Sequence, residues 1–376
     1  MKQRMKLERF AVWIALGVAI ATPGGANDGA PFDPADSKSW EVPLADLFDV
    51  DMEGSRAYAA GYWGMVLRSL DRGATWNVTQ TPVERNLHAI DFADEMHGWA
   101  VGAQGVIIRT TDGGDSWVLQ IAEVDDEFEG RITIEESLFG VVALSKDVAW
   151  AVGDLGVIIH TSDGGTTWQR ERVPEENFAD TELPDRIFNA IEFSTPESGW
   201  ITGEFGTLLR SADGGASWQG ARQLEGSVED IYLIGMANAG EQLSFACGVG
   251  GVAIRTRDGG KSWSTLSVPT GAGLYDIAAS GENVIVVGDR GVIFTSADAG
   301  ETWRDPKRPQ LFNWLQGVDY GENGRVVVVG EKATILFSTD GGASFEKALV
   351  ESPKAARERQ AIMLLEMGSQ EPPPAR

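Results

Sequence analysis

The sequence predicts an all-β protein, a seven-bladed β-propeller with four-stranded blades, on the strength of three observations. An eight-residue pattern, Ser/Thr-x-Asp-x-Gly-x-Ser/Thr-aromatic, occurs seven times at intervals of 40 to 51 residues. Short apolar segments of strand length surround each copy of the pattern. The 376 residues include 46 Gly and 13 Trp, as a repeated tight turn and a repeated packing position require. Repeats of this length are typical of propeller blades.

Each residue type in the repeated pattern has a physical role. The Asp carboxylate can accept hydrogen bonds from its own turn, and the Gly two positions later permits a positive φ. The hydroxyl groups connect the two ends of the turn, and the aromatic residue starts the next strand. This device is called an Asp box or BNR repeat, and we expect it between the third and fourth strands of each blade. Its aspartates are assigned a structural role: Asp71, Asp112, Asp163, Asp213, Asp258, Asp298 and Asp340.

The segments upstream of each box supply the other three strands. A Gly-x-x-Gly motif predicts a two-residue hairpin turn between the second and third strands. The third strands are apolar on both alternating sets, so neighbouring blades should cover both faces of each sheet. A closed ring also removes exposed sheet edges. The expected first strands are Leu47–Asp51, Leu87–Phe92, Leu138–Ala143, Ile187–Phe193, Val228–Leu233, Leu274–Ala278 and Leu315–Tyr320.

Four regions are predicted along the chain. Residues 1–26 carry basic residues, a 12-residue apolar run and Gly24-Gly25-Ala26, the pattern of a signal peptide cleaved after Ala26 or, alternatively, after Ala21. A linker (27–39) precedes the propeller (40–350). Residues 351–376 are expected to form an amphipathic helix and a Pro-rich tail. The protein is therefore predicted to be periplasmic or secreted.

The closure of the ring has two solutions at this stage. The segment around Trp40 resembles a fourth strand without an Asp box before it, so it could complete the seventh blade from the N-terminal side. The segment that begins at Phe345 follows the last box and could complete the same blade from the C-terminal side.

Composition narrows the classes of function. The chain carries 56 acidic against 31 basic residues, a net charge of −25, which disfavours nucleic-acid binding and polybasic attachment to membranes. Any membrane association should be peripheral at most. The single cysteine, Cys247, excludes a disulfide framework and a cysteine-based metal site. With three histidines as well, no metal and no cofactor are expected.

Candidate partner-binding residues lie on both faces of the predicted ring. Large apolar residues at hairpin tips often contact partners, although they can also lie down on neighbouring loops. Long acidic connectors follow the second and third blades on the same face, and together they suit a basic or amphipathic polypeptide. These candidates are Tyr62, Trp63, Leu155, Phe205, Asp125, Asp126, Glu127, Glu175 and Glu176.

A column of arginines immediately before the Asp boxes is the second candidate surface. The arginine stems could pack on aromatic neighbours with their heads in water. Alternatively, the column could form a basic arc on the Asp-box face that holds an acidic segment of a partner. Its members are Arg68, Arg109, Arg210 and Arg255.

The boxes and the strand pairs before them, as in W99-AVGAQGVII-R109, resemble the photosystem II stability/assembly factor family of BNR propellers over roughly residues 40–350. In oxygenic phototrophs, this resemblance implies an exported, non-enzymatic chaperone that binds a membrane-protein client through a basic patch. This chain is strongly acidic and lacks a lipoprotein cysteine. It is similar to a proteobacterial branch, which implies an envelope assembly role beside a membrane protein, with an export permease as one candidate partner. We expect the protein to be a monomer.

Two other classes of function remain as alternatives. A sialidase-type glycoside hydrolase needs an arginine cluster, a Tyr nucleophile and an early Arg-Ile-Pro motif, which Arg131-Ile132-Thr133 and Arg186-Ile187-Phe188 do not match. The abundant acidic residues leave a hydrolytic carboxylate pair open. A glycan-binding propeller could use Trp63 or Trp314 as a stacking surface. The main prediction is a non-enzymatic interaction scaffold or assembly factor for a membrane protein complex.

Overall fold

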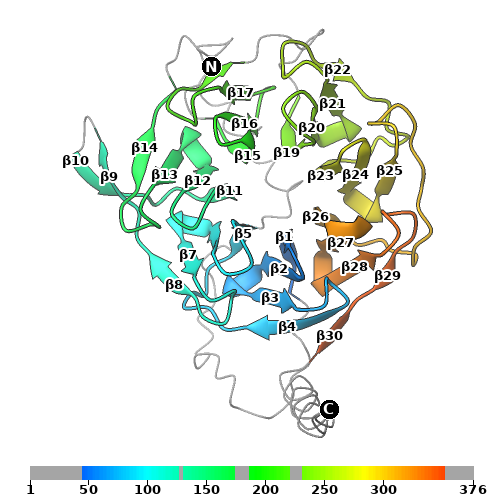
Figure 1. Cartoon of the computed structure of the whole chain (residues 1–376), viewed down its shortest axis with the longest axis horizontal. Coiled ribbons are helices and arrows are strands. Elements are labelled where there is room, and N and C mark those ends of the chain that lie inside the picture. The colour runs from blue at the N-terminus through cyan, green and yellow to red at the C-terminus, as the bar shows by residue number, and fades with distance from the viewer. Residues whose placement is uncertain (1–44, 127–129, 174–185, 221–230, 352–376) are drawn as a thin grey trace, which may run out of the picture. The chain divides into compact units, whose positions relative to one another are not determined.

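The computed structural model describes residues 45–126, 130–173, 186–220 and 231–351, which form seven antiparallel blades around a central axis (Figure 1). The predicted seven-bladed, four-stranded architecture is confirmed. The expected signal peptide, the N-terminal linker and the helix after residue 354 lie outside the described residues. Within the described residues, no helix is long and apolar enough to cross a membrane.

Four concentric sets of strands build the ring. The innermost strands are β1 (Leu47–Glu53), β5 (Leu87–Phe92), β11 (Leu138–Ala143), β15 (Phe188–Thr195), β19 (Leu233–Asn238), β23 (Leu274–Ser280) and β26 (Leu315–Gly321). The second strands are β2 (Arg56–Gly61), β6 (Gly98–Gly102), β12 (Ala149–Gly153), β16 (Ser198–Gly203), β20 (Ser244–Gly248), β24 (Asn283–Gly288) and β27 (Arg325–Gly330). The third strands are β3 (Val66–Ser69), β7 (Ile107–Thr110), β13 (Ile158–Thr161), β17 (Leu208–Ser211), β21 (Ala253–Thr256), β25 (Ile293–Ser296) and β28 (Thr334–Ser338).

The outer strands are shorter and less regular. They are β4 (Thr75–Thr79), β8 (Val118–Gln120), β14 (Gln169–Glu171), β18 (Gln219–Gly220), β22 (Ser264–Thr265) and β29 (Glu346–Lys347). In the sixth blade the outer strand is reduced to a single bridge between Thr295 and Arg304. Pro306 and Pro309 follow this bridge, and proline cannot donate a ladder hydrogen bond. A separate hairpin, β9 (Glu123–Asp126) with β10 (Gly130–Thr133), extends outward after the second blade (Figure 1).

The C-terminal solution closes the seventh blade. Strand β29, which begins immediately after Phe345, pairs with β28 through Leu336–Lys347 and Phe337–Glu346. The chain then adds a fifth, parallel strand, β30 (Leu349–Glu351), to β4 of the first blade. This strand joins the last part of the ring to the first. Trp40, the alternative, lies outside the described residues.

Two local predictions are wrong. The Gly-x-x-Gly hairpins are three-residue loops, because Gly61 N–H donates to Met65 O and leaves residues 62–64 in the turn. The first strand of the fifth blade is Leu233–Asn238 rather than Val228–Leu233. Leu233 lies opposite Gly248 just as Leu87 lies opposite Gly102. The position of this strand therefore follows the register of the repeat and not the apolar residues that precede Leu233.

The Asp boxes have the predicted geometry in all seven blades. In the third blade, Thr161 Oγ1 donates to Asp163 Oδ1 at 2.9 Å, and the Thr167 N–H donates to the same oxygen at 2.9 Å. Thr167 Oγ1 donates to Asp163 Oδ2 at 2.7 Å. These bonds to the ionised form lower the pKa of Asp163. The carboxylate therefore belongs to the turn and is unsuited to acid–base chemistry.

We expect Asp163→Ala to lower the free energy of unfolding by roughly 1–3 kcal/mol, because the turn donors lose their acceptor. Urea denaturation followed by tryptophan fluorescence measures this change. Asp147→Ala is the matched control, since the Asp147 side chain is also largely exposed and, among the described residues, pairs with Lys146 at the surface rather than with a turn. An unchanged midpoint for Asp163→Ala would refute this account of the box.

Candidate functional site

The tips of the hairpins between second and third strands carry the most unusual side chains on the ring. The middle residue of each tip has a positive φ, a backbone conformation that favours glycine. Only the fifth blade has a glycine there; the residues are Trp63, Gln104, Leu155, Phe205, Gly250, Arg290 and Lys332. Trp63 and Leu155 are 70% and 48% exposed. Bulky apolar residues at strained, solvent-facing positions do not stabilise the fold, so a contact outside the ring is their best explanation.

A continuous set of aromatic rings connects Trp63 to the start of the inner strands. Trp63 contacts Tyr62, which packs on Phe48 with ring centroids 5.1 Å apart. Phe48 stacks on Trp314 at 6.2 Å and meets the His88 ring, which stacks on Phe139 at 5.2 Å. We call the six residues the aromatic arc: Phe48, Tyr62, Trp63, His88, Phe139 and Trp314. The arc joins the seventh, first, second and third blades at one mouth of the central channel.

The four predicted tip residues divide into two pairs. Trp63 and Leu155 project from the surface, as a partner contact requires. Tyr62 and Phe205 are only partly exposed, and Phe205 lies on Tyr232 with ring centroids 5.3 Å apart. These two side chains lie on neighbouring residues of the ring, and their contact with a partner stays a prediction.

The channel itself is lined by carboxylic acids that the sequence analysis did not single out. Four of them connect successive inner strands, each accepting a hydrogen bond from a backbone N–H of the next blade. Asp49 accepts from Ile90 at 2.8 Å, and Asp91 from Ala143 at 2.6 Å. In the same way, Asp276 accepts from Val318 and Asp319 from Met52, both at 2.8 Å. These bonds tie the sixth, seventh, first, second and third blades together at the axis.

Two further channel acids, Asp51 and Glu192, have a different environment. Asp51 Oδ2 is buried without a hydrogen-bond partner among the described residues. Burial, with the like charges of Asp91 and Asp319, holds the pKa of both acids well above its usual range. Burial also raises the pKa of Asp49 to about 6, of Asp319 to about 7 and of Asp91 to about 8. The sequence could have pointed to these channel acids, because each of them interrupts an otherwise largely apolar inner strand.

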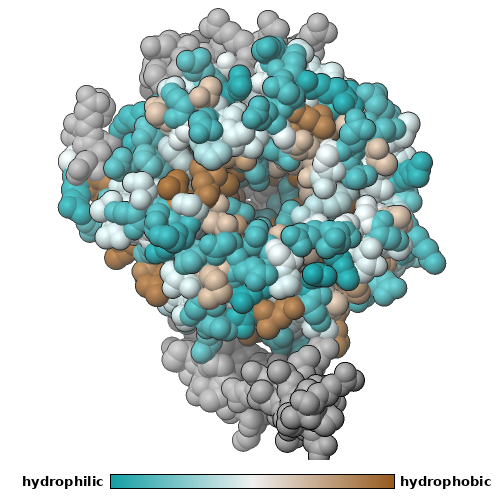
Figure 2. Space-filling model, viewed as in Figure 1, coloured by the Kyte–Doolittle hydropathy of each residue, from teal (hydrophilic) through white to brown (hydrophobic). Residues whose placement is uncertain are grey.

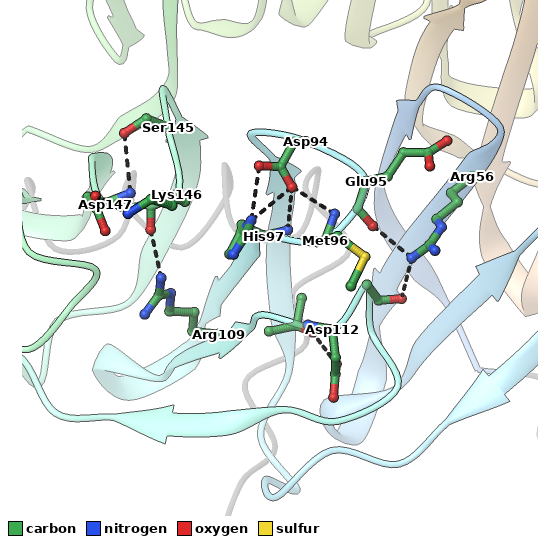
Figure 3. Close-up of polar contacts among 12 residues, drawn as sticks. Arg56, Asp94, Glu95, Met96, His97, Arg109, Asp112, Ser145, Lys146 and Asp147 are labelled. Atoms are coloured by element: carbon green, nitrogen blue, oxygen red, sulfur yellow. Dashed lines mark hydrogen bonds and ion pairs between the residues drawn. The ribbon is translucent and has the colours of Figure 1, made fainter.

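The arginine column is occupied by contacts between blades. Arg68 donates to Gly113 O at 2.8 Å and pairs with Asp115 of the next Asp box. Arg255 similarly binds Ala299 O and Glu301, and Arg109 donates to Lys146 O at 2.6 Å (Figure 3). Arg210 lies over the Trp200 ring. Three of the four guanidinium groups are thus bound to the adjacent blade, which accounts for the column without a partner.

Of the predicted acidic connector residues, the structure describes the backbone of two. Asp125 and Asp126 belong to β9, whose hairpin packs beside β14 at the outer margin of the ring (Figure 1). Glu127, Glu175 and Glu176 lie outside the described residues. Figure 2 shows the hollow at the centre of the ring, and the acids that the structure places around it are those of the inner strands.

No group of three or more His, Cys, Asp or Glu side chains in the described part of the chain has an arrangement that could hold a metal ion. His88 donates through Nδ1 to Leu138 O at 3.0 Å, and burial lowers its pKa, so it acts as a neutral tie between blades. Cys247 is fully buried in β20, where burial raises the pKa of its thiol.

A family model described as photosynthesis system II assembly factor YCF48 matches residues 68–184 and 175–307, which is more than half of the chain. The chain belongs to this family. Two relatives named photosystem II assembly lipoprotein Ycf48 are similar to it. The Synechococcus protein is 25% identical over 273 residues, covering 72% of this chain and 64% of that protein. The Picosynechococcus protein is 32% identical over 244 residues, covering 63% and 68%.

Solved structures show the same fold at lower identity. YCF48 from Cyanidioschyzon merolae superimposes with a TM-score of 0.62 at 20% identity, covering 79% of this chain and 95% of that one. YCF48 bound to D1 peptide gives 0.55 at 21% identity, with 71% and 82% covered. The GH74 enzyme of Niastella koreensis gives 0.61 at 12% identity, with 81% and 54% covered. The propeller fold is therefore shared by binding proteins and enzymes, and only the site can distinguish them.

Proposed function

We propose that this protein is an exported, non-enzymatic propeller that binds an apolar segment of a membrane protein during assembly of its complex. The contact surface in this proposal consists of the exposed tips of Trp63 and Leu155 together with the partly exposed rings of the aromatic arc, while Phe48, which is buried, supports those rings. The observation that carries it is the exposure of Trp63 and Leu155 at backbone positions that favour glycine.

Membership of the YCF48 family supports the assembly role, and the N-terminal signal pattern supports export. The solved YCF48 complex contains a peptide of D1, so a propeller of this family can hold a polypeptide segment. The partner proposed here is a membrane protein of the cell envelope, and an export permease is one candidate. The protein is proposed to remain monomeric and peripheral to the membrane.

The direct test is affinity purification of the tagged full-length protein from crosslinked membranes, read by mass spectrometry. A membrane protein enriched by the unaltered chain should fall by more than about tenfold with the double variant Trp63→Gly/Leu155→Gly, since apolar anchors dominate such interfaces. Glycine suits both backbone positions, so the double variant should fold normally.

Gln104→Gly is the matched control, because Gln104 occupies the same tip position in the second blade and is polar. Retention of the same partner by the double variant would show that the contact surface lies elsewhere. Binding on a glycan array that Trp63→Ala abolishes, with no membrane protein enriched, would instead favour a carbohydrate-binding propeller. The exposed indole of Trp63 is the observation that supports this second candidate.

A further inference from the structure

The inner strands line the channel with acids. The seven inner strands contain Asp49, Asp51, Asp91, Glu192, Asp276 and Asp319 among their channel-facing positions, and none of these strands contains a lysine or arginine. His88 at the mouth is neutral, and Glu53 lies at the opposite end of β1. A protein-lined channel with one sign of charge attracts the opposite sign.

Glu192 is the acid that the fold does not use. Its carboxyl group accepts no hydrogen bond from the described residues, whereas those of Asp49, Asp91, Asp276 and Asp319 each accept one from the next blade. It comes from the fourth blade, yet the carboxyl groups of those four acids in the first, second, sixth and seventh blades all act on it. The strand register gives the same placement: Glu192 lies opposite Trp200, just as Asp51 lies opposite Tyr58 and Asp91 opposite Trp99, so the acids occupy equivalent positions of the inner strands. Asp51 stands at this level too, and its Oδ2 has no hydrogen-bond partner among the described residues.

The aromatic arc and these acids occupy successive levels of the same strands. Phe48 precedes Asp51 by three residues in β1, and His88 precedes Asp91 by three in β5. Three residues of strand span about 10 Å. This depth corresponds to the reach of an extended lysine or arginine side chain together with one hydrogen bond. Aromatic faces at the mouth also favour a passing cation.

We propose that the channel receives the ammonium or guanidinium group of a lysine or arginine in the partner segment, between Glu192 and Asp51, while apolar neighbours of that residue lie on the aromatic arc. This inference rests on the proposed function and names the chemistry of the partner: a basic residue within an apolar stretch. The acids that hold a neighbouring backbone N–H keep their structural role, which leaves the carboxyl groups of Glu192 and Asp51 for the cation.

A cation in the channel favours the ionised carboxylates, so binding at neutral pH should release protons. This linkage separates insertion into the channel from contact at the rim. The experiment uses two synthetic peptides, acetyl-Gly-Leu-Phe-Lys-Phe-Leu-Gly-amide and the same peptide with norleucine in place of lysine. Isothermal titration calorimetry on the mature full-length protein at pH 7, in phosphate and in Tris, measures both affinity and proton release.

The lysine peptide should bind at least about tenfold more tightly than the norleucine peptide and should release protons. Glu192→Gln should remove most of both differences, and Asp51→Asn should give the same result if the first variant folds poorly. Glu123→Gln, an exposed acid of β9 paired with Arg131, is the control and should change neither.

The outcomes separate the two proposals. Equal binding of both peptides, with loss of both in Trp63→Gly, would overturn the channel inference and leave the apolar contact surface intact. Unchanged lysine preference in both channel variants would likewise overturn it. Binding of neither peptide would count against the apolar contact surface itself, and the channel inference would fail with it.

Discussion

The folded protein is expected to lose stability as the pH rises from about 5 to 8. A protein whose carboxylates are all in ion pairs would keep its stability over this range. The channel acids have a pKa near 6 for Asp49, 7 for Asp319 and 8 for Asp91, whereas an unfolded aspartate has a pKa near 3.8. Between these values the folded state binds more protons than the unfolded state. The stabilisation by these groups is therefore fully present below about pH 4 and is lost as the pH rises through the folded pKa values.

At the acid end of the pH range, stability is limited by the Asp boxes, because the pKa values of their aspartates are lowered and not raised. Hydrogen bonds from Ser262 and from Thr302 lower the pKa of Asp258 and of Asp298 to about 2. Their contribution is present above the unfolded pKa and disappears as the pH falls toward 2. Maximal stability should lie between these two effects, near pH 4 to 5.

The melting temperature from circular dichroism, recorded from pH 4 to pH 9, measures this profile. A fall on the order of 10 °C between pH 5 and 8 corresponds to a few kcal/mol. Asp91→Asn and Asp319→Asn should each flatten the slope, because an amide cannot ionise but still offers a carbonyl acceptor. Asp147→Asn, at the surface, should leave the slope unchanged. A melting temperature that rises from pH 5 to 8 would contradict the burial of these acids in their folded environment.

The repeat made the fold predictable because every blade repeats the same local chemistry. Register is transmitted from one blade to the next, so even the misplaced first strand of the fifth blade could have been found by aligning Leu233 with Leu87. Closure through β29 and β30 was harder to predict from the sequence, because strands of two and three residues carry little pattern of their own. The position of β30 depends on the strand edge that β4 presents.

The site was less predictable than the fold, for a physical reason. Trp63 and Leu155 stood out as large residues at turn tips, but the sequence could not show which tips project and which, like Phe205, lie on a neighbour. Glu192 is separated by about 140 residues from Asp51, so only ring closure brings the two to one axis. Single strands show where an acid interrupts an apolar segment, whereas the channel exists only when all inner strands converge.

The largest single-residue effect on stability is expected at the second glycine of the Asp box. Gly215 has a φ of +91°, and a Cβ atom there would overlap the Trp150 ring of the preceding blade. Trp218, the aromatic residue of the same box, meets Trp150 at 6.1 Å in an edge-to-face arrangement. The glycine and the aromatic residue of one box therefore pack on one tryptophan of the preceding blade. Gly260, Trp263 and Trp200 repeat this contact at the next junction.

We expect Gly215→Ala to lower the free energy of unfolding by about 3–5 kcal/mol. An alanine is strained at this positive φ, and its methyl group would be overpacked against the buried Trp150 ring. Gly250→Ala is the matched control, because Gly250 also has a positive φ, +76°, but a Cβ atom there would meet nothing within 4 Å. This control should cost roughly 1 kcal/mol. Guanidinium denaturation measures both values.

A double-mutant cycle then tests the origin of the effect. In a Trp150→Leu background the indole is gone, so the additional cost of Gly215→Ala should fall toward that of Gly250→Ala. An equal cost in both backgrounds would place the effect in backbone strain alone. A reduced cost would establish that the box glycine is required by the neighbouring blade, so that the repeated Asp-x-Gly pattern specifies the contact between repeats as well as the turn within each one.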